Sequence, residues 1–332
     1  MGPNVGIIIL NWNGWEDTLE CLESLYKINY ENYHVVLVDN GSDDDSIEKI
    51  NEYCSNKTQH RLAGWTADIK LFELEEKDFN HISINKKEKN INKELILLKN
   101  AKNYGYAKGN NIGIRFTFMA LNPEYILLLN NDTTVDRNFL KELMEAAKNQ
   151  ERVGIYAPKI LRDDNHKIID STGHIINWGR IIDRGYKKVD KNQYDHQREI
   201  IGAKGAAALY KSEMLQSVGL FKEDYIISYE DAELSWRAHK KSWKAIYVPK
   251  SVVYHKGERS IKKDNDKMLY FKKLSLNNMA FTVKEYGTIN QKIQFTLILI
   301  REMILSHIPI LRNITNSEKL NYIHTIKHLY KN

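Results

Sequence analysis

Short apolar runs alternate with amphipathic segments along the first 130 residues. Four runs have no polar interruption, which is typical of strands buried on both faces of a parallel sheet. They lie at residues 5–10, 35–38, 96–98 and 125–129. Segments with helical spacing lie between them, at residues 17–26, after the polar turn 39–44, and at 109–119. The alternation predicts an open, mostly parallel α/β sheet with right-handed crossovers and flanking helices.

The rhythm changes at three places further along the chain. Residues 51–94 are polar and rich in Lys and Asn, which predicts a surface insertion with one short strand or helix near 69–74. Residues 153–210 mix short strand-like pieces with a Gly/Ala stretch. Beyond residue 260 the pattern becomes that of basic amphipathic helices, with twelve Lys/Arg against five Asp/Glu in 261–332. We therefore expect a main domain over 1–260 and a helical C-terminal extension over 261–332.

Composition narrows the class of protein. The 332 residues are 42% hydrophobic and 28% charged, enough for a sizeable core, which excludes a disordered chain or a collagen-like repeat. The two cysteines, Cys21 and Cys54, form neither a disulfide framework nor a thiolate metal site, so we expect a reducing compartment. A net charge of +6 suits an anionic small ligand or a membrane surface and does not by itself predict nucleic acid as a partner.

No segment has the pattern of a signal peptide or of a spanning helix. The best spanning candidate, residues 295–311, contains Arg301, Glu302 and His307. We expect a cytoplasmic protein that contacts the inner face of the cell membrane at most peripherally.

Polar side chains follow the apolar runs at the points where parallel strands would end. Ligands of open α/β sheets bind beyond these carboxyl ends. The residues are Asn11, Asn13, Asp39, Asn40, Ser42, Asp43, Asn130, Asn131 and Asp132. Each one alone also fits a helix cap or a turn. Three strand ends that direct polar groups into one crevice favour a binding site.

The common phosphate-binding loops are absent. Neither G-x-G-x-x-G nor G-x-x-x-x-G-K-[ST] occurs, and Gly105, Gly109 and Gly113 recur at a four-residue interval that fits neither. A nicotinamide dehydrogenase and a P-loop NTPase are both disfavoured. If a nucleotide binds, a divalent metal held by Asp132 would neutralise its phosphates, because Mg²⁺ typically takes one or two protein carboxylates plus phosphate oxygens.

Two further segments carry candidate chemistry. Glu230 and Asp231 begin a predicted helix, where acidic residues complement the helix dipole or, alternatively, provide a general base. His255 follows a predicted strand and precedes Lys256 and Arg259. A lone His is more often structural, but this one is placed to bind a metal while the two cations contact a diphosphate.

Taken in order, these segments resemble the inverting family 2 glycosyltransferases of the GT-A fold, particularly the rhamnosyltransferase-like members. The resemblance runs from residue 5 to about residue 260 and is interrupted by the insertion. The matching strings are IIILNWNGWEDTLECLESL, VVLVDNGSDDDS, NYGYAKGNNIGI, YILLLNNDTTVD, GAAALYKSEMLQSVGLF, YEDAELSWRAHKKSWKAIYVP and VVYHKGERS.

The resemblance implies a donor site for a nucleoside diphosphate sugar. Asp39 would contact the base or ribose. The same pocket would be lined by Asn11, Asn13, Asn40, Ser42, Asn103, Gly105, Lys108, Asn111, Asn130 and Asn131. The donor would be linked to dTDP, UDP or GDP, and the Gln-x-x-Arg-Trp motif of processive synthases is absent, so we expect a single sugar transfer.

The resemblance also assigns the chemistry. Asp132 matches the last carboxylate of the family's Asp-x-Asp, with Asn130 in place of the first, and would bind Mg²⁺ or Mn²⁺ together with His255. Asp231, beside Glu230, matches the catalytic base. Lys256 or Arg259 would help to stabilise the leaving diphosphate.

Two rival functions remain open. A nucleotidyltransferase also combines an α/β sheet with acidic metal ligands, but usually has a glycine-rich basic loop near its N-terminus. A non-catalytic carbohydrate-binding relative is supported only by Asn130. The extension either packs on the main domain or docks on an anionic membrane where a lipid-linked acceptor would lie. Its apolar residues considered for docking are Ile298, Leu299, Ile300, Ile304 and Leu305.

Overall fold

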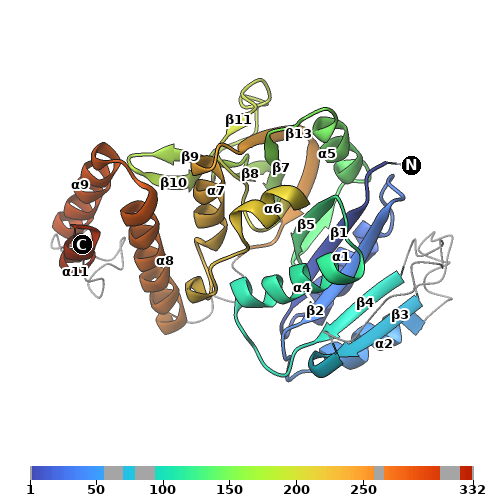
Figure 1. The fold of residues 1–332 in the computed structure, drawn as a ribbon. Coiled ribbons are helices and arrows are strands. Elements are labelled where there is room, and N and C mark those ends of the chain that lie inside the picture. The colour runs from blue at the N-terminus through green and yellow to red at the C-terminus, as the bar shows by residue number, and fades with distance from the viewer. Residues whose placement is uncertain (1, 56–69, 79–93, 258–264, 307–321, 331–332) are drawn as a thin grey trace.

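The computed structural model describes residues 2–55, 70–78, 94–257, 265–306 and 322–330. Eleven strands of this part of the chain form one sheet (Figure 1). Its order is β11-β13-β7-β12-β5-β1-β2-β4-β3, with β6 paired to β13 and β8 to β7. The strands are β1 (Val5–Asn11), β2 (Tyr33–Asp39), β3 (Lys70–Glu75), β4 (Glu94–Lys99), β5 (Tyr125–Asn130), β6 (Thr133–Val135), β7 (Val153–Arg162), β8 (Asn165–Ser171), β11 (Glu199–Ile200), β12 (Ala207–Lys211) and β13 (Lys244–His255). A separate hairpin pairs β9 (His174–Asn177) with β10 (Arg180–Asp183).

The N-terminal half of the sheet is parallel. β1 lies between β2 and β5, β2 pairs with β4, and β4 pairs with β3. All four apolar runs are strands, and the element expected near 69–74 is β3. The register places Asn11 opposite Asp39 and Leu10 opposite Asn130. The polar residues at these strand ends therefore lie side by side.

The C-terminal half of the sheet is mixed. β12 is antiparallel to both β5 and β7, while β13 is parallel to β7 and antiparallel to β6. β13 passes through Pro249 as one strand, with a register shift between Val248 and Val252. A bulge is expected there, because proline cannot donate a ladder hydrogen bond.

Helices cover both faces of the sheet and enclose two apolar cores. One core joins the sheet to α1 (Trp15–Leu25), α2 (Ser46–Ser55) and α5 (Phe139–Ala147). The other joins it to α4 (Tyr106–Ala120), α6 (Ser212–Val218) and α7 (Glu230–Lys240). The remaining short turns are the 3₁₀ segments η1 (Glu76–Asp78) and η2 (Glu223–Tyr225). The predicted open α/β sheet with flanking helices is confirmed.

The C-terminal extension is helical, as expected, and lies at one end of the molecule (Figure 1). It consists of α8 (Asn265–Tyr286), α9 (Ile289–Ser306) and α11 (Tyr322–Tyr330). A third core joins these helices to Trp236 of α7 through Val283, Phe295 and Leu329. Within the described residues, no helix is long and apolar enough to cross a membrane. The expected domain boundary at 260/261 lies outside the described residues.

Candidate functional site

Asn11, at the end of β1, is the centre of a group of side chains that we call the amide cluster. Its members are Asn11, Thr18, Asp39, Ser42 and Asn131. Asn11 Nδ2 donates to Asp39 Oδ1 (2.8 Å) and to Ser42 Oγ (3.2 Å), while its Oδ1 accepts from Thr18 Oγ1 (2.9 Å). Asn11 and Asp39 are buried, so their hydrogen bonds fix the shape of the strand ends.

Asn40 ties the end of β2 to the segment that precedes α4. Its Nδ2 donates to Asn103 Oδ1 (3.0 Å) and to the Gly105 carbonyl (3.2 Å). Gly105 has a φ of +81°, and a Cβ there would lie 2.9 Å from the Ile226 carbonyl oxygen. The glycine is therefore required by its backbone conformation and by the close approach of the 226–229 loop.

Several predicted donor-site residues have other partners. Asn13 is exposed and hydrogen-bonds to Asp43. Lys108 lies over the Tyr104 ring, 4.5 Å from its centroid. Asn111 is buried and bonded to the Phe221 backbone, and Lys256 pairs with Asp17 and Glu20 of α1. Asn13 also donates its backbone N–H to Ser42 Oγ of the amide cluster (3.0 Å). Arg259 lies outside the described residues.

Beyond β5, carboxylates alternate with basic side chains in a continuous series that we call the ionic chain. Its consecutive N···O separations are 3.3, 2.9, 2.8, 3.6, 3.5 and 3.8 Å. The members in order are Asp132, His255, Asp170, Lys204, Asp183, His174 and Asp231. The ionic chain therefore joins the expected metal ligands to the expected base.

Asp132 and His255 fit a divalent metal. His255 Nδ1 faces Asp170 Oδ2 at 2.9 Å, which leaves Nε2 directed at Asp132 Oδ1, 3.3 Å away. A second carboxylate on the far ring nitrogen commonly orients a histidine that binds a metal. No group of three His, Cys, Asp or Glu among the described residues is arranged to hold a metal. Two protein ligands suit a site that donor phosphates and water complete.

The charges in this part of the ionic chain stabilise one another. Burial alone would lower the pKa of His255, but hydrogen bonds to Asp132 and Asp170 raise it to about 9. Burial would raise the pKa of Asp170, but hydrogen bonds and charges from His255 and Lys204 lower it to about 2. Without a bound cation, the protein thus holds His255 protonated between two carboxylates.

Asp170, His174, Asp183 and Lys204 were not predicted from the sequence. Asp170 lies near the end of β8 and Asp183 ends β10, while His174 begins β9, outside the parallel strands whose ends were searched. The sequence pattern could have indicated Lys204, because it is the single charged residue within the otherwise apolar segment 200–210.

Asp231 and Glu230 lie at the start of α7 in different surroundings. Asp231 accepts hydrogen bonds from the Gly205 N–H (2.6 Å) and the Ala232 N–H (2.7 Å). Glu230 is 5% exposed, and burial together with the charge of Asp231 raises its pKa to about 8. The Tyr106 hydroxyl lies 2.9 Å from the Gly205 carbonyl and 3.0 Å from Asn130 Oδ1. Tyr106 thereby connects the end of β5 to the backbone that holds Asp231.

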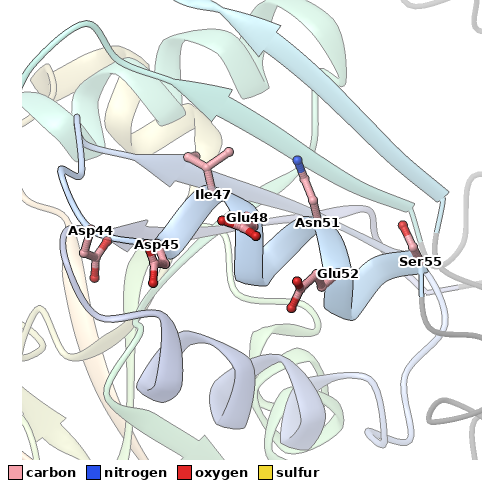
Figure 2. A pocket seen from close by; sticks show the side chains of 7 residues that line it. All are labelled: Asp44, Asp45, Ile47, Glu48, Asn51, Glu52 and Ser55. Atoms are coloured by element: carbon pink, nitrogen blue, oxygen red, sulfur yellow. The ribbon is translucent and has the colours of Figure 1, made fainter.

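A surface pocket of about 730 Å³ lies elsewhere, along α2 (Figure 2). It is lined by Asp44, Asp45, Ile47, Glu48, Asn51, Glu52 and Ser55. Its four carboxylates would repel phosphates, and none of the predicted site residues lines it. We therefore place the candidate site at the strand ends and along the ionic chain.

The chain matches two family models. "Glycosyl transferase family 2" matches residues 6–79, and "Glycosyltransferase like family 2" matches residues 84–269, more than half of the chain. The chain belongs to the family 2 glycosyltransferases. The resemblance on which the sequence interpretation depended is thus confirmed at the level of the family.

Two relatives share part of the sequence. A hexosyltransferase of Haloferax volcanii, Agl10 of low-salt glycan biosynthesis, is 25% identical over 140 residues, 42% of this chain and 45% of that protein. A poly-beta-1,6-N-acetyl-D-glucosamine synthase of Staphylococcus epidermidis is 22% identical over 252 residues, 75% of this chain and 49% of that protein. The chain spans about half the length of these curated relatives.

Solved structures share the fold at low identity. The mannosyltransferase PcManGT of Pyrobaculum calidifontis, in complex with GDP-Man and Mn²⁺, aligns with a TM-score of 0.55 at 14% identity, over 99% of this chain and 88% of that one. GalNAc-T7 with UDP, GalNAc and Mn²⁺ aligns with a TM-score of 0.59 at 15% identity, over 98% of this chain and 56% of that one. The predicted GT-A fold is confirmed.

Proposed function

We propose that this chain transfers one sugar from a nucleoside diphosphate sugar to a hydroxyl of a glycan or lipid-linked acceptor, with inversion at the anomeric carbon. The observation that carries the proposal is the ionic chain, which joins the partly exposed Asp132 and the buried His255 to Asp231. Family membership supports the reaction class. The solved relatives that hold GDP-Man or UDP support a donor of this kind.

The amide cluster and Asn40 would bind the nucleoside part of the donor. Asp39 has a buried carboxylate at the end of β2, a suitable acceptor for a ribose hydroxyl or a base N–H. The diphosphate would lie toward Asp132. A divalent cation held by Asp132 and His255 would stabilise charge on the leaving diphosphate.

Asp231 would act as the general base. It removes the proton from the acceptor hydroxyl as that oxygen attacks the anomeric carbon opposite the departing diphosphate. Two backbone N–H groups fix the carboxylate of Asp231, and neither is a proton source at neutral pH. Glu230, with a pKa raised to about 8, would stay protonated beside it.

The donor class can be tested by thermal shift with UDP, dTDP, GDP and NAD, each with and without Mn²⁺. A ligand at a hundred times its Kd stabilises the folded state by about 2.7 kcal/mol. We expect a Mn²⁺-dependent shift with one nucleoside diphosphate, absent in Asp132→Asn and retained in the control Asp136→Asn, whose side chain is exposed. A shift with NAD alone, or with none of the four, would contradict the proposal.

Product analysis separates this function from its rivals. Incubation with the matching sugar nucleotide, without acceptor, should slowly release nucleoside diphosphate by hydrolysis. A nucleotidyltransferase would release no nucleoside diphosphate in this incubation, but with added pyrophosphate it would convert the sugar nucleotide to a nucleoside triphosphate and a sugar 1-phosphate. A carbohydrate-binding relative would release nothing in either incubation.

We further propose that α9 docks on an anionic membrane, which would bring the site to a lipid-linked acceptor. Five apolar side chains, spaced by four, four, three and four residues, are exposed along one face of α9: Ile289, Ile293, Leu297, Ile300 and Ile304. Leu299, part of the row expected from the sequence, is instead buried in the third core. The basic composition of the extension complements an anionic surface.

Flotation with vesicles of phosphatidylglycerol and phosphatidylcholine tests the docking. The triple variant Ile293→Ser, Leu297→Ser, Ile300→Ser should lose flotation, while the control Asn290→Ser, Gln294→Ser on an adjacent exposed face should keep it. Equal flotation of the two variants would overturn the assignment of this face.

A further inference from the structure

One buried side chain of the C-terminal extension contacts the loop that carries the proposed base. Asn278, on α8, is 6% exposed. Its Nδ2 lies within hydrogen-bond distance of three carbonyl oxygens, those of Tyr225 (3.0 Å), Ile227 (3.3 Å) and Ser228 (2.7 Å). The two hydrogens of a single amide are thus shared among three backbone carbonyl groups within the five residues that precede Glu230.

The backbone of this loop is in a conformation that its residues rarely adopt. Ile226, Ser228 and Tyr229 have φ values of +51°, +73° and +72°, in the left-handed region that favours glycine. Such residues persist only where their surroundings determine them, and they are common at functional sites. The contacts with α8 are part of those surroundings.

A second contact joins α8 to the same loop. Thr282 lies one turn beyond Asn278, and its hydroxyl is 2.8 Å from the phenol oxygen of Tyr225. Both residues are buried. From the other side, the Tyr229 hydroxyl is held by the backbone of Ile181 on β10.

The loop contacts both halves of the candidate site. The Ile226 carbonyl accepts hydrogen bonds from the Tyr106 N–H (2.8 Å) and the Ala107 N–H (3.2 Å), at the start of α4. Two residues after Ser228, the chain enters α7 with Glu230 and Asp231. A shift of this loop would move Asp231 relative to the donor site.

We propose that Asn278 is a positioning residue for catalysis, which makes α8 part of the active-site architecture rather than an appendage. The inference rests on the proposed function, because it acts through Asp231. The amide of Asn278 donates hydrogen bonds to carbonyl oxygens of the loop and thereby fixes the backbone that leads to Asp231. A carboxylate of the same size and shape cannot donate and would face those oxygens with negative charge.

The test is Asn278→Asp, compared with Asn277→Asp. Asn277 is the adjacent residue on α8 and is exposed, so the control makes the same chemical change on the same helix. We measure kcat and KM for sugar-nucleotide turnover and the affinity for the matching nucleoside diphosphate with Mn²⁺. For Asn278→Asp we expect a 10- to 100-fold lower kcat, since small displacements of catalytic groups cost up to about 10² in rate. Its diphosphate affinity should equal that of wild type and of Asn277→Asp.

A pH profile separates positioning from packing. Protonation of the new carboxyl restores one donor, so the kcat of Asn278→Asp relative to wild type should rise as the pH falls. The ratio for Asn277→Asp should stay flat. If Asn278→Asp has the kcat of wild type, or loses diphosphate affinity as much as turnover, the proposal is overturned.

Two further variants test the proposal, one for the case that Asn278→Asp does not fold and one to check Asp231 as the base. If Asn278→Asp does not fold, Thr282→Val removes the hydroxyl contact with Tyr225 at similar volume and should lower kcat several-fold at unchanged diphosphate affinity. An unchanged kcat in that variant would then overturn the proposal. Asp231→Asn is measured in parallel: if it remains active, the assigned base is wrong, whereas an inactive Asp231→Asn with a fully active Asn278→Asp refutes the positioning role alone.

Discussion

The amide cluster lies at strand ends of the main sheet, whereas the ionic chain extends from that sheet to the β9–β10 hairpin, and the two are stabilised by different chemistry. The amide cluster joins mostly neutral side chains at the ends of β1, β2 and β5 and at the start of α1, with Asp39 as its only carboxylate. The ionic chain alternates carboxylates with His or Lys, drawn from strand ends, loops and α7. The amide cluster is held mainly by hydrogen bonds among amide and hydroxyl groups and one carboxylate, whereas the ionic chain from Asp132 to Asp183 pairs opposite charges.

The difference has an energetic consequence. Loss of a neutral hydrogen bond typically costs about 0.5–1.5 kcal/mol. Removal of one partner from a buried ion pair costs about 3–5 kcal/mol, because the other charge is left uncompensated. Substitutions in the ionic chain should therefore change the free energy of unfolding by larger and more varied amounts than those in the amide cluster.

The largest effect on kcat is expected at Asp231, the last member of the ionic chain. Asp231→Asn should lower kcat by about 10²–10⁴-fold, because general-base catalysis typically contributes that much. Nucleoside diphosphate affinity, measured by calorimetry with Mn²⁺, should remain as in wild type. The control is Asp224→Asn, an exposed carboxylate seven residues earlier. Loss of diphosphate affinity equal to the loss of turnover would show that Asp231 binds the donor instead.

A smaller effect, on metal affinity and stability, is expected in the middle of the ionic chain. Asp170→Asn removes the carboxylate that faces both His255 and Lys204. Mn²⁺ affinity should fall about 10–100-fold, because the orientation of His255 is lost. The free energy of unfolding should fall by about 3–5 kcal/mol, measured in urea.

The double variant Asp170→Asn, Lys204→Met separates these two effects. In Asp170→Asn the lysine charge faces Asp183 alone, so its removal should recover part of the stability while Mn²⁺ affinity stays low. If Mn²⁺ affinity recovers together with stability, His255 is not the group that Asp170 orients.

Substitution in the amide cluster should have a smaller effect, on nucleoside diphosphate affinity rather than on kcat. Asp39→Asn replaces an oxygen that accepts hydrogen bonds from Asn11 and Ser42 with a donor or a weaker acceptor. We expect nucleoside diphosphate affinity to fall about tenfold, the equivalent of about 1.4 kcal/mol, at nearly unchanged kcat. Asp45→Asn, an exposed carboxylate after the same strand, is the control. A kcat loss as large as that of Asp231→Asn would remove the functional distinction between the two regions.

The same two regions explain what the sequence could reveal. The amide cluster follows from the pattern, because uninterrupted apolar runs predict parallel strands and adjacent parallel strands bring their ends together. Asn11 and Asp39 are predicted by position alone and lie opposite each other in the register. The family resemblance added roles for Asp132, Asp231 and His255.

The sequence predicted only some members of the ionic chain. Its members Asp170, His174 and Asp183 come from antiparallel strands and a hairpin, whose pairing depends on contacts distant in sequence. Lys256 was expected near the diphosphate because it follows His255, yet its side chain pairs with Asp17 and Glu20. Side chains of residues adjacent in sequence need not point in the same direction. Asn278 lies in the extension, 47 residues after Asp231, and nothing in its local pattern indicates the loop that it contacts.

The effect expected at Glu230 is on the pH dependence of stability. This buried carboxyl lies beside the ionic chain and has no cationic partner among the described residues. Burial and the charge of Asp231 raise its pKa to about 8, so the folded state keeps a proton that the unfolded chain loses above about pH 4.5. Between pH 5 and 8 this group therefore lowers stability as the pH rises, by at most about 1.4 kcal/mol per pH unit.

Glu230→Gln cannot ionise, so its Tm relative to wild type should increase steadily from pH 5 to pH 8. The control Glu16→Gln changes an exposed carboxylate in the first turn of α1 and should show no such trend. A Tm difference for Glu230→Gln that is independent of pH would mean that Glu230 is already ionised in the folded protein, and that Asp231 has a charged neighbour rather than a neutral one.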